Sequence, residues 1–224
     1  MIPNQDVYIV ADGVGGNNSG EVASSTAVES LASFIKKNDL KSCETPEEIF
    51  GFFTEAVDTA NRNVYRLGQS EMNYRGMATT VVMAYIRDNV AYLTNIGDSR
   101  AYLFRNGRLK RVTKDHTYVN ELIKKGLITE KEAETHSQKN VITKAVGAEF
   151  EAEPDFYRVS LEPEDVMVLC SDGLYGEVGE DRMTDVLKMA VAKGTGMNEL
   201  CADFVDEAIL AGGRDNITVI CIRI

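Results

Sequence analysis

The sequence predicts an α+β fold, in which two facing antiparallel sheets lie between two outer helix pairs as a four-layer α-β-β-α sandwich. Strand-like runs follow one another with turn-length connections over residues 79–112, which favours antiparallel pairing over strand-helix-strand crossovers. The last run, residues 217–224, is apolar on both alternating faces, so it needs cover on both. Two stacked sheets with helices outside them provide that cover.

Composition indicates one globular domain over residues 1–224. Hydrophobic residues make up 44% and charged residues 26%, and no Pro/Ser/Gly-rich linker divides the chain. No apolar run approaches the roughly 20 residues that span a bilayer, and the start lacks a signal-peptide profile, so we expect a cytoplasmic protein without membrane contact. The net charge of −11 argues against a nucleic-acid binder, because phosphate backbones would be repelled.

Cysteine and histidine usage argues against zinc. The four cysteines have no C-x-x-C spacing, and the chain has only two histidines. Cys170 and Cys221 sit inside apolar runs, so we expect reduced core thiols.

Helix signals are clear in four places. A helix follows Asn18 or Ser19, either of which can cap it, and ends at Lys36-Lys37. A second helix begins with the capping box of Thr45 and Glu48 and stops at Gly68. Two more are expected over residues 180–193 and 197–210, with Ile209 facing inward.

Strand pairs are predicted in three places. Residues 79–86 and 90–96 form a hairpin, and residues 101–104 and 109–112 form another around Asn106-Gly107, a strong type I′ turn signal. Residues 156–161 and 166–170 are expected to pair around the turn at Pro163.

The stretch from 116 to about 153 is polar and has no long strand, which predicts an inserted helical flap with helices over residues 118–125 and 129–135. Basic residues are concentrated just before and within it. Between positions 105 and 125 they are Arg105, Arg108, Lys110, Arg111, Lys114, Lys124 and Lys125, against Asp115 and Glu121. This basic stretch is either a solvated face or a docking surface for acidic or phosphorylated substrate.

Four aspartates carry the candidate chemistry. Asp12 ends an apolar run and is followed by Gly13, Gly15 and Gly16, while Asp98 and Asp172 end two further runs. Asp215 comes just before the last run. A single Asp-Gly is most simply a turn, but the recurrence suggests convergence at one end of the sheets. Clustered carboxylates without histidine select hard cations such as Mg²⁺ or Mn²⁺.

Seven short motifs then resemble a known family, the metal-dependent protein serine/threonine phosphatases of type 2C (PPM) in their compact bacterial form. They are Ala11-Asp12-Gly13-Val14-Gly15-Gly16 with Ser19-Gly20-Glu21-Val22-Ala23-Ser24, Gly76-Met77-Ala78-Thr79-Thr80, Asn95-Ile96-Gly97-Asp98-Ser99-Arg100, Thr113-Lys114-Asp115-His116, Val146-Gly147, Cys170-Ser171-Asp172-Gly173-Leu174 and Asp215-Asn216-Ile217-Thr218. They occur in the family's order from end to end.

The resemblance implies two Mn²⁺ or Mg²⁺ ions about 4 Å apart that activate a shared water for attack on phosphoserine or phosphothreonine. It assigns a bridging role to Asp12, a carbonyl ligand to Gly13, and the remaining protein ligands of one ion to Asp172 and Asp215. Asp98, with Asp172, matches the residue that holds a weaker third ion in bacterial members. The partners implied are phosphorylated proteins, targets of a serine/threonine kinase, and we expect a monomer.

Two departures from the family pattern leave alternatives open. Family members usually carry, before the first aspartate motif, an N-terminal strand with an arginine that grips the substrate phosphate and an acidic pair that supports the metals. This sequence has no arginine before Asp12. Asn4-Gln5-Asp6 looks like the pair but lies too close to Asp12 to take that role. Val14 stands where some relatives have a histidine. The alternatives to an active protein phosphatase are a catalytically impaired regulatory or binding module with this fold, and a phosphatase of small phosphate esters.

Overall fold

Two four-stranded antiparallel sheets face one another in the computed structural model, which describes residues 1–2, 5–15 and 19–224. The first sheet contains β1 (Val7–Val10), β4 (Val81–Arg87), β5 (Val90–Ile96) and β8 (Asp155–Ser160), in that order. The second contains β10 (Val219–Arg223), β9 (Val166–Cys170), β6 (Arg100–Arg105) and β7 (Arg108–Arg111). Each sheet therefore has two edge strands. β8 is an edge of the first sheet, and β7 is an edge of the second.

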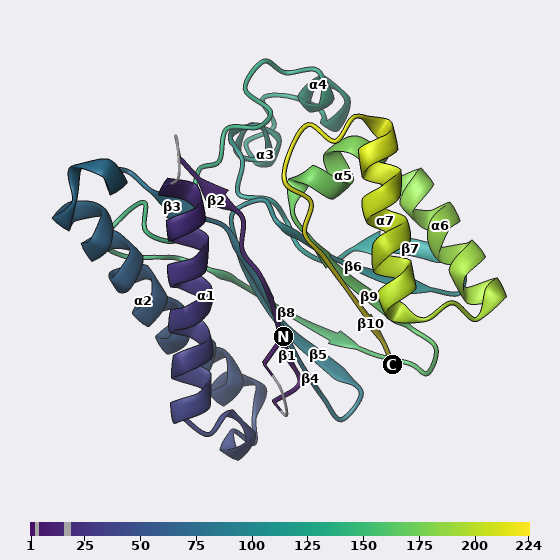
Figure 1. The fold of residues 1–224 in the computed structure, drawn as a ribbon, viewed down its shortest axis with the longest axis horizontal. Helices are drawn as coiled ribbons and strands as arrows, with labels where there is room; N and C mark the ends of the chain where they lie inside the picture. The colour runs from purple at the N-terminus through teal and green to yellow at the C-terminus, as the bar shows by residue number, and fades with distance from the viewer. Residues whose placement is uncertain (3–4, 16–18) are drawn as a thin grey trace.

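Helices cover the outer face of each sheet, as Figure 1 shows. The first sheet is covered by α1 (Ser19–Lys37) and α2 (Pro46–Ser70), and the second by α5 (Asp172–Val178), α6 (Glu180–Lys193) and α7 (Met197–Ala211). Three apolar clusters fill the spaces between these four layers, one under each helix layer and one between the sheets. The predicted four-layer α+β sandwich is confirmed.

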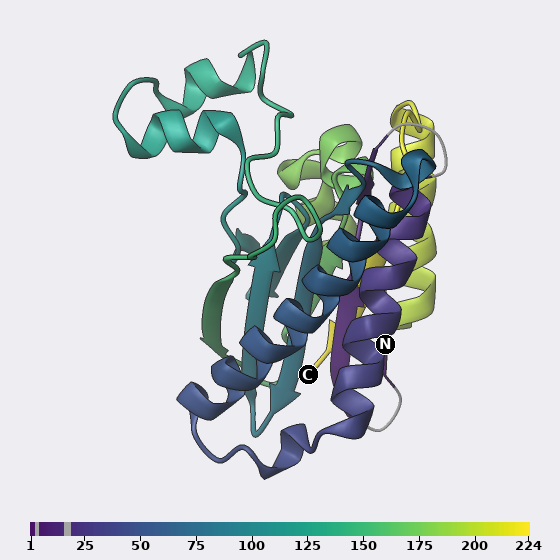
Figure 2. The ribbon, with the colours of Figure 1, turned by 90° about the vertical axis from the view of Figure 1, so that its left-hand side faces the viewer.

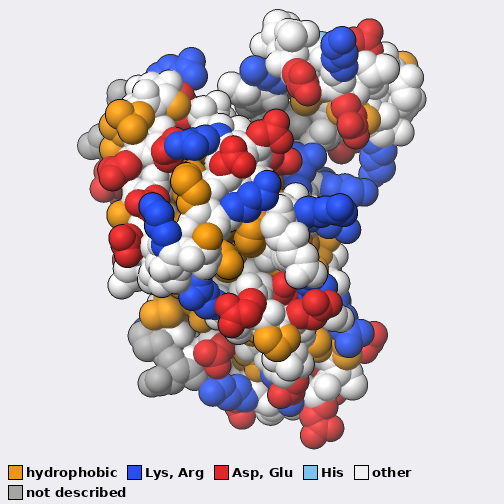
Figure 3. Space-filling model, turned by 90° about the vertical axis from the view of Figure 1, so that its right-hand side faces the viewer, with side chains coloured by type: hydrophobic (Ala, Val, Ile, Leu, Met, Phe, Trp, Pro, Cys, Tyr) orange, Lys and Arg blue, Asp and Glu red, His pale blue; other side chains and the backbone are white. Residues whose placement is uncertain are grey.

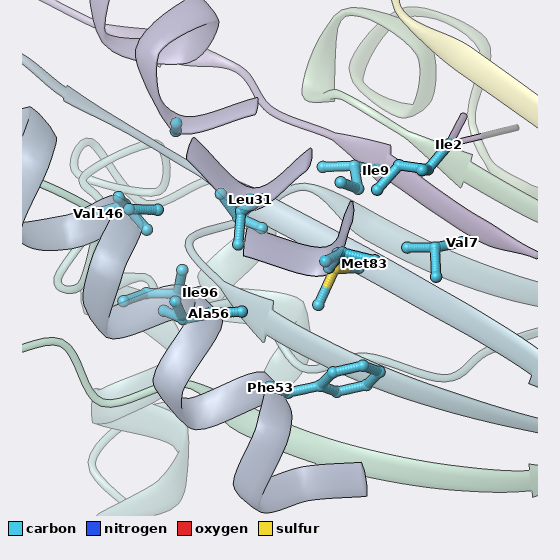
Figure 4. Packing of buried hydrophobic residues seen from close by; sticks show 14 of the residues in the cluster. Ile2, Val7, Ile9, Leu31, Phe53, Ala56, Met83, Ile96 and Val146 are labelled. Atoms are coloured by element: carbon cyan, nitrogen blue, oxygen red, sulfur yellow. The ribbon is translucent and has the colours of Figure 1, made fainter. Parts of the chain in front are cut away.

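The largest apolar cluster lies between the first sheet and its two helices. Leu31 of α1 and Phe53 of α2 are fully buried there and point toward Met83 of β4 (Figure 4). Burying each such side chain contributes about 1.5–3 kcal/mol relative to leaving it exposed. The helix α2 starts as predicted, since Thr45 and Glu48 form a complete capping box.

Both predicted local hairpins are present. β4 pairs with β5 and β6 pairs with β7. Asn106 and Gly107, between β6 and β7, have φ angles of 51° and 74°, the positive values that a type I′ turn requires.

The third predicted pair is wrong. β8 pairs with β5 in the first sheet, whereas β9 lies between β10 and β6 in the second. Residues 161–165 therefore connect two different sheets and do not close a hairpin. Both segments carry the sequence signals of a hairpin. Their actual partners are the free edge of β5 and the gap between β6 and β10, and these exist only once the sheets have assembled, so no local pattern reports them.

Several smaller predictions also differ from the structure. Ile209 is 57% exposed at the end of α7, because Phe204 and Ala208 already fill that helix's inward face. The helix α2 continues past Gly68 to Ser70. The short helix α5 and the two-stranded sheet of β2 (Gly13–Val14) and β3 (Ala78–Thr79) had no sequence prediction. The predictions for Asn4, Gly16 and Asn18 lie outside the described residues.

The flap projects from one end of the sandwich, as Figure 2 shows. It contains α3 (Tyr118–Lys124) and α4 (Glu130–Glu134), close to the predicted helices. Its base is closed by a bridge between Thr117 and Ile142, next to a hydrogen bond of 2.8 Å from the Tyr118 amide to the Val141 carbonyl. Short 3-10 turns at Leu40–Ser42 and Met72–Tyr74 flank α2.

None of the described helices combines the length and the apolar character needed to cross a membrane. All four cysteines are free thiols; Cys170 is buried in the core as expected, whereas Cys221, Cys43 and Cys201 are only partly buried.

Candidate functional site

Four aspartates meet where strand ends from both sheets lie together. Asp12 follows β1 and Asp98 follows β5, and the ends of these strands flank the start of β4 through the pairs Val10–Val82 and Val81–Ile96. Asp172 follows β9 and Asp215 precedes β10, where Val219 pairs with Cys170. Asp12 interacts electrostatically with the other three, so the site joins the two sheets.

The backbone of Asp12 is fixed by neighbouring threonines. Its amide donates to Thr80 Oγ1 at 3.0 Å, and its carbonyl accepts from the Thr80 amide and the Thr79 hydroxyl, both at 2.8 Å. The Thr80 hydroxyl in turn shares a hydrogen bond of 2.6 Å with buried Ser99. These contacts hold the carboxyl of Asp12 in place beside the loop that carries Asp98.

Gly13 is required by a close backbone approach. A Cβ on Gly13 would lie 1.9 Å from the carbonyl oxygen of Gly20, in the first turn of α1. Only glycine permits this contact. The helix α1 therefore packs directly on the short strand β2 that follows Asp12.

Asp172 is held at the first turn of α5. Its neighbour Ser171 accepts a hydrogen bond of 3.0 Å from the Thr218 amide, which joins the end of β9 to the approach of β10. A Cβ on Gly173 would lie 2.2 Å from the Asn216 carbonyl oxygen, so this glycine lets the Asp215 loop pack against α5. Arg214 reaches back to Glu177 of α5 at 2.8 and 2.9 Å.

Burial and repulsion between carboxylates raise the pKa values of Asp12, Asp98 and Asp172. Burial first, and then the carboxylates of Asp172, Asp215 and Asp98, raise the pKa of Asp12 to about 7. Burial and Asp172 likewise raise the pKa of Asp98 to about 7. The pKa of Asp172 is also raised, chiefly by burial. Such strained carboxylates favour a site where positive charge is bound.

A second ring of residues supports Asp98. The Tyr175 hydroxyl donates to the Asp98 carbonyl at 3.0 Å, and the Arg100 guanidinium lies 3.4 Å from the centre of the Tyr175 ring. Arg100 also makes a two-pronged ion pair with buried Asp115, with a shortest distance of 2.7 Å. The charge of Arg100 is thus paired with Asp115, and Arg100 helps to hold the loop of residues 97–100 in position.

The donors at this site suit a hard cation. All four side chains offer carboxylate oxygens, and Asp172 Oδ1 is buried without a hydrogen-bond partner among the described residues. In the described part of the chain no three His, Cys, Asp or Glu side chains are already gathered as ligands of a single ion. An ion bound here would therefore take much of its coordination from water, as Mg²⁺ does in proteins.

Comparison with a protein-family model shows which family this chain belongs to. Residues 2–204 match the model described as protein phosphatase 2C. The chain belongs to the protein phosphatase 2C family.

Relatives of this family are similar over nearly the whole chain. The "Serine/threonine phosphatase stp" of Listeria welshimeri is 37% identical over 220 residues, which is 98% of this chain and 85% of that protein. The "Protein phosphatase PhpP" of Streptococcus pneumoniae strain D39 is 38% identical over 213 residues, 95% of this chain and 83% of that protein.

Solved structures of protein phosphatase 2C relatives share the fold. The serine/threonine phosphatase of S. agalactiae superposes with a TM-score of 0.89 at 35% identity, covering 97% of this chain and 87% of that one. The catalytic domain of the phosphatase PstP, solved with two manganese ions, has a TM-score of 0.77 at 29% identity and covers 99% and 92% of the two chains.

The sequence singled out four aspartates of this protein phosphatase 2C chain, and in the structure Asp12 interacts electrostatically with the other three; their role as metal ligands stays a prediction. It missed the support that Tyr175 and the Arg100–Asp115 pair give to Asp98. Arg100 and Asp115 lie in two of the recognised motifs, which was the available signal. Tyr175 lies in a helix that carries two glycines and was not expected.

Proposed function

We propose that this chain is a protein serine/threonine phosphatase that depends on Mn²⁺ or Mg²⁺. The observation that carries the proposal is the electrostatic interaction of Asp12 with Asp98, Asp172 and Asp215 near the strand ends of the two sheets, with pKa values of Asp12 and Asp98 raised to about 7. A module that only binds other proteins has no use for carboxylates held in mutual repulsion. The family and the names of its relatives support the reaction class.

Bound divalent ions would supply a water acidified for attack and positive charge to offset the phosphoryl oxygens. In our assignment Asp12 would be a ligand of both ions and the Gly13 carbonyl would add one more ligand. Asp172 and Asp215 would complete the protein ligands of one ion, and Asp98 with Asp172 would hold a weaker third. The two manganese ions of the PstP structure support the metal and the number.

The chain's own residues set the geometry for this chemistry. Thr79 and Thr80 fix the backbone of Asp12, and Ser171 and Gly173 fix Asp172 against the Asp215 loop. Tyr175 and Arg100 hold the loop of Asp98. The substrates in this proposal are proteins phosphorylated on serine or threonine by a kinase. The cytoplasmic location and the monomeric state stay predictions from the sequence.

The test is hydrolysis of a phosphothreonine peptide and of a small aryl phosphate with Mn²⁺. Asp172→Ala or Asp215→Ala should each lower turnover by about 100-fold or more, because either change removes a carboxylate that offsets cation charge. Circular dichroism should remain that of the wild type. Asp203→Ala, at an exposed position of α7, is the matched control and should keep full activity.

Unchanged turnover in the Asp172 or Asp215 variant would remove the basis for the assignment. Hydrolysis of the aryl phosphate but not of the peptide would favour the small-ester alternative. No hydrolysis of either substrate by the folded wild type would favour the impaired regulatory module.

A further inference from the structure

A long groove runs along one side of the sandwich, between the edge strands of the two sheets. It has a volume of about 1010 Å³ and is bounded by the β6–β7 hairpin on one side and by β8 on the other. Its lining comprises Leu103, Arg105, Asn106, Arg108, Leu109, Lys110, Arg111, Val112, Phe156, Tyr157, Arg158 and Val159. We name it the β7–β8 groove.

The β7–β8 groove is basic in a chain whose net charge is −11. Its lining has four arginines and one lysine and no acidic residue. Arg105 forms an ion pair with Asp165, and Arg111 lies 3.4 Å from Asp115, whose carboxylate also pairs with Arg100. Within the described residues, Arg108 and Lys110 are exposed and have no ion pair, so their charge is available to a ligand. In Figure 3, Lys and Arg side chains gather below the projecting flap.

The floor of the groove is apolar. Leu103, Val112, Tyr157 and Val159 belong to the cluster between the two sheets, and Val112, Tyr157 and Val159 are only partly buried. Arg108 and Lys110 are two residues apart on β7, so they share one face of the strand, while Leu109 points to the opposite face and packs under the helices. A ligand in the groove therefore meets cations on one side and apolar surface beneath.

Both walls are edge strands, which present unpaired backbone amide and carbonyl groups. Among the strands of the described residues, β7 pairs only with β6, and β8 pairs only with β5. An extended peptide can add to such an edge through backbone hydrogen bonds, while its side chains alternate between two faces. The lining fits a segment in which acidic residues alternate with apolar ones.

One end of the β7–β8 groove leads to the aspartate site. The Lys114 amide, just beyond β7, donates to the Tyr157 hydroxyl of β8 at 3.0 Å. Two residues later, the His116 amide donates at 2.9 Å to the Gly97 carbonyl, next to Asp98. This end of the groove therefore lies next to the loop that carries Asp98.

We propose that the β7–β8 groove docks an extended, acid-rich segment of the phosphoprotein substrate, adjacent in sequence to the phosphorylated residue. The proposal rests on the proposed phosphatase function and adds a recognition site outside the reacting centre. It favours the docking interpretation of the basic stretch over the solvated-face interpretation for Arg108 and Lys110.

The test compares Arg108→Glu/Lys110→Glu with Lys41→Glu/Arg66→Glu, which changes net charge equally at exposed positions near α2. The substrates are a phosphothreonine peptide with an alternating Glu/Val tail, the same peptide with a Ser/Gly tail, and a small aryl phosphate. The groove variant should raise KM for the acidic peptide about tenfold, with kcat little changed, because two attractive charges become repulsive. The other two substrates and the control variant should keep wild-type constants.

A binding measurement separates this proposal from the phosphatase assignment. Fluorescence anisotropy of the unphosphorylated Glu/Val peptide, in the presence of a chelator, should show binding to the wild type and the control variant but not to the groove variant. If the peptide binds but no substrate is hydrolysed, the groove is supported as a binding site for acidic peptides and the phosphatase assignment fails. Hydrolysis without peptide binding, equal KM values in both variants, or binding of anionic vesicles in place of the peptide would each overturn the groove proposal.

Discussion

Gly173 is the single residue on which the packing of the Asp215 loop depends most directly. A Cβ there would lie 2.2 Å from the Asn216 carbonyl oxygen, which is backbone and cannot rotate away. Gly176, one turn later in α5, is exposed, and a Cβ added there would have nothing within 4 Å. The two glycines thus share a helix and differ only in their surroundings.

We expect Gly173→Ala to destabilise the protein by about 1–3 kcal/mol and to weaken Mn²⁺ binding, since the Asp215 loop must shift. Gly176→Ala should be neutral or stabilising by up to about 1 kcal/mol, because alanine favours the helix. Chemical denaturation and calorimetric titration with Mn²⁺ measure both effects. Equal stability in the two variants would contradict the close packing.

Asp12 and Asp98 make the stability of the metal-free protein depend on pH. Their folded pKa values are about 7, above the ordinary value of 3.8, so between these limits the folded state binds protons that the unfolded state has lost. Stability therefore falls as pH rises through this window.

In thermal melts with a chelator, Tm should drop between about pH 4 and pH 7, and Asp98→Asn should flatten the drop because it removes one titrating group. Added Mn²⁺ should raise Tm more at the higher pH, where the carboxylates are free of protons. A wild type and an Asp98→Asn variant with parallel pH profiles would contradict the raised pKa of Asp98.

At the scale of elements, Arg105 connects the two sheets at the end opposite the aspartates. It lies at the end of β6 and donates to the Ser160 carbonyl of β8 at 2.8 Å. It also forms a two-pronged pair with buried Asp165, just before β9, at 2.9 and 2.6 Å. Exposed Glu162 contacts the same guanidinium at 2.9 Å.

Asp165→Ala should cost about 2–4 kcal/mol of unfolding free energy, since it leaves Arg105 without its buried partner. Glu162→Ala removes the exposed contact with the same arginine and should cost at most about 1 kcal/mol. Urea denaturation gives both values. Similar losses in the two variants would show that burial of the Asp165 pair does not matter.

The elements predicted best from the sequence are those with strong local signals. The capping box of Thr45 fixed the start of α2, and Asn106-Gly107 fixed the β6–β7 turn. The partners of β8 and β9 could not be predicted in this way, because either strand could pair locally and only the assembled sheets decide between edges. α5 was missed because it is seven residues long and includes Gly173 and Gly176, which lower helix propensity.

The candidate site follows the same division. The four aspartates at strand ends could be predicted from the sequence, because a carboxylate next to a buried apolar run is costly unless a cation or a hydrogen-bond donor compensates it. The supporting contacts of Tyr175 and Thr80 come from residues far away in the chain, and no local pattern reports them.

At the scale of the whole molecule, the flap is joined to the sandwich through a narrow base. We propose that residues 1–224 form one domain with the flap as an appendage to it. Tyr118 and Val141 are hydrogen-bonded at that base, so a short connection can replace the residues beyond it.

Replacing residues 122–139 by a short Gly/Ser linker should leave the sandwich folded, with Tm within about 5 °C of the wild type, because lengthening or shortening a surface loop costs little entropy. Circular dichroism should lose only the helical signal of the flap, and the near-ultraviolet spectrum of the sandwich should persist. Loss of cooperative unfolding would show that the flap is part of the core domain.

The aspartates come in pairs from opposite halves of the sandwich: Asp12 and Asp98 follow strands of the first sheet, whereas Asp172 and Asp215 flank strands of the second. On the proposed assignment, a cation shared between Asp12 and Asp172 would act as a removable cross-link between two layers that share an apolar core and are also joined by polar contacts such as that of Arg105 with Ser160. Sliding one layer along the other would then stretch the coordination bonds. The geometry of the reacting centre would therefore depend directly on how the two layers are aligned.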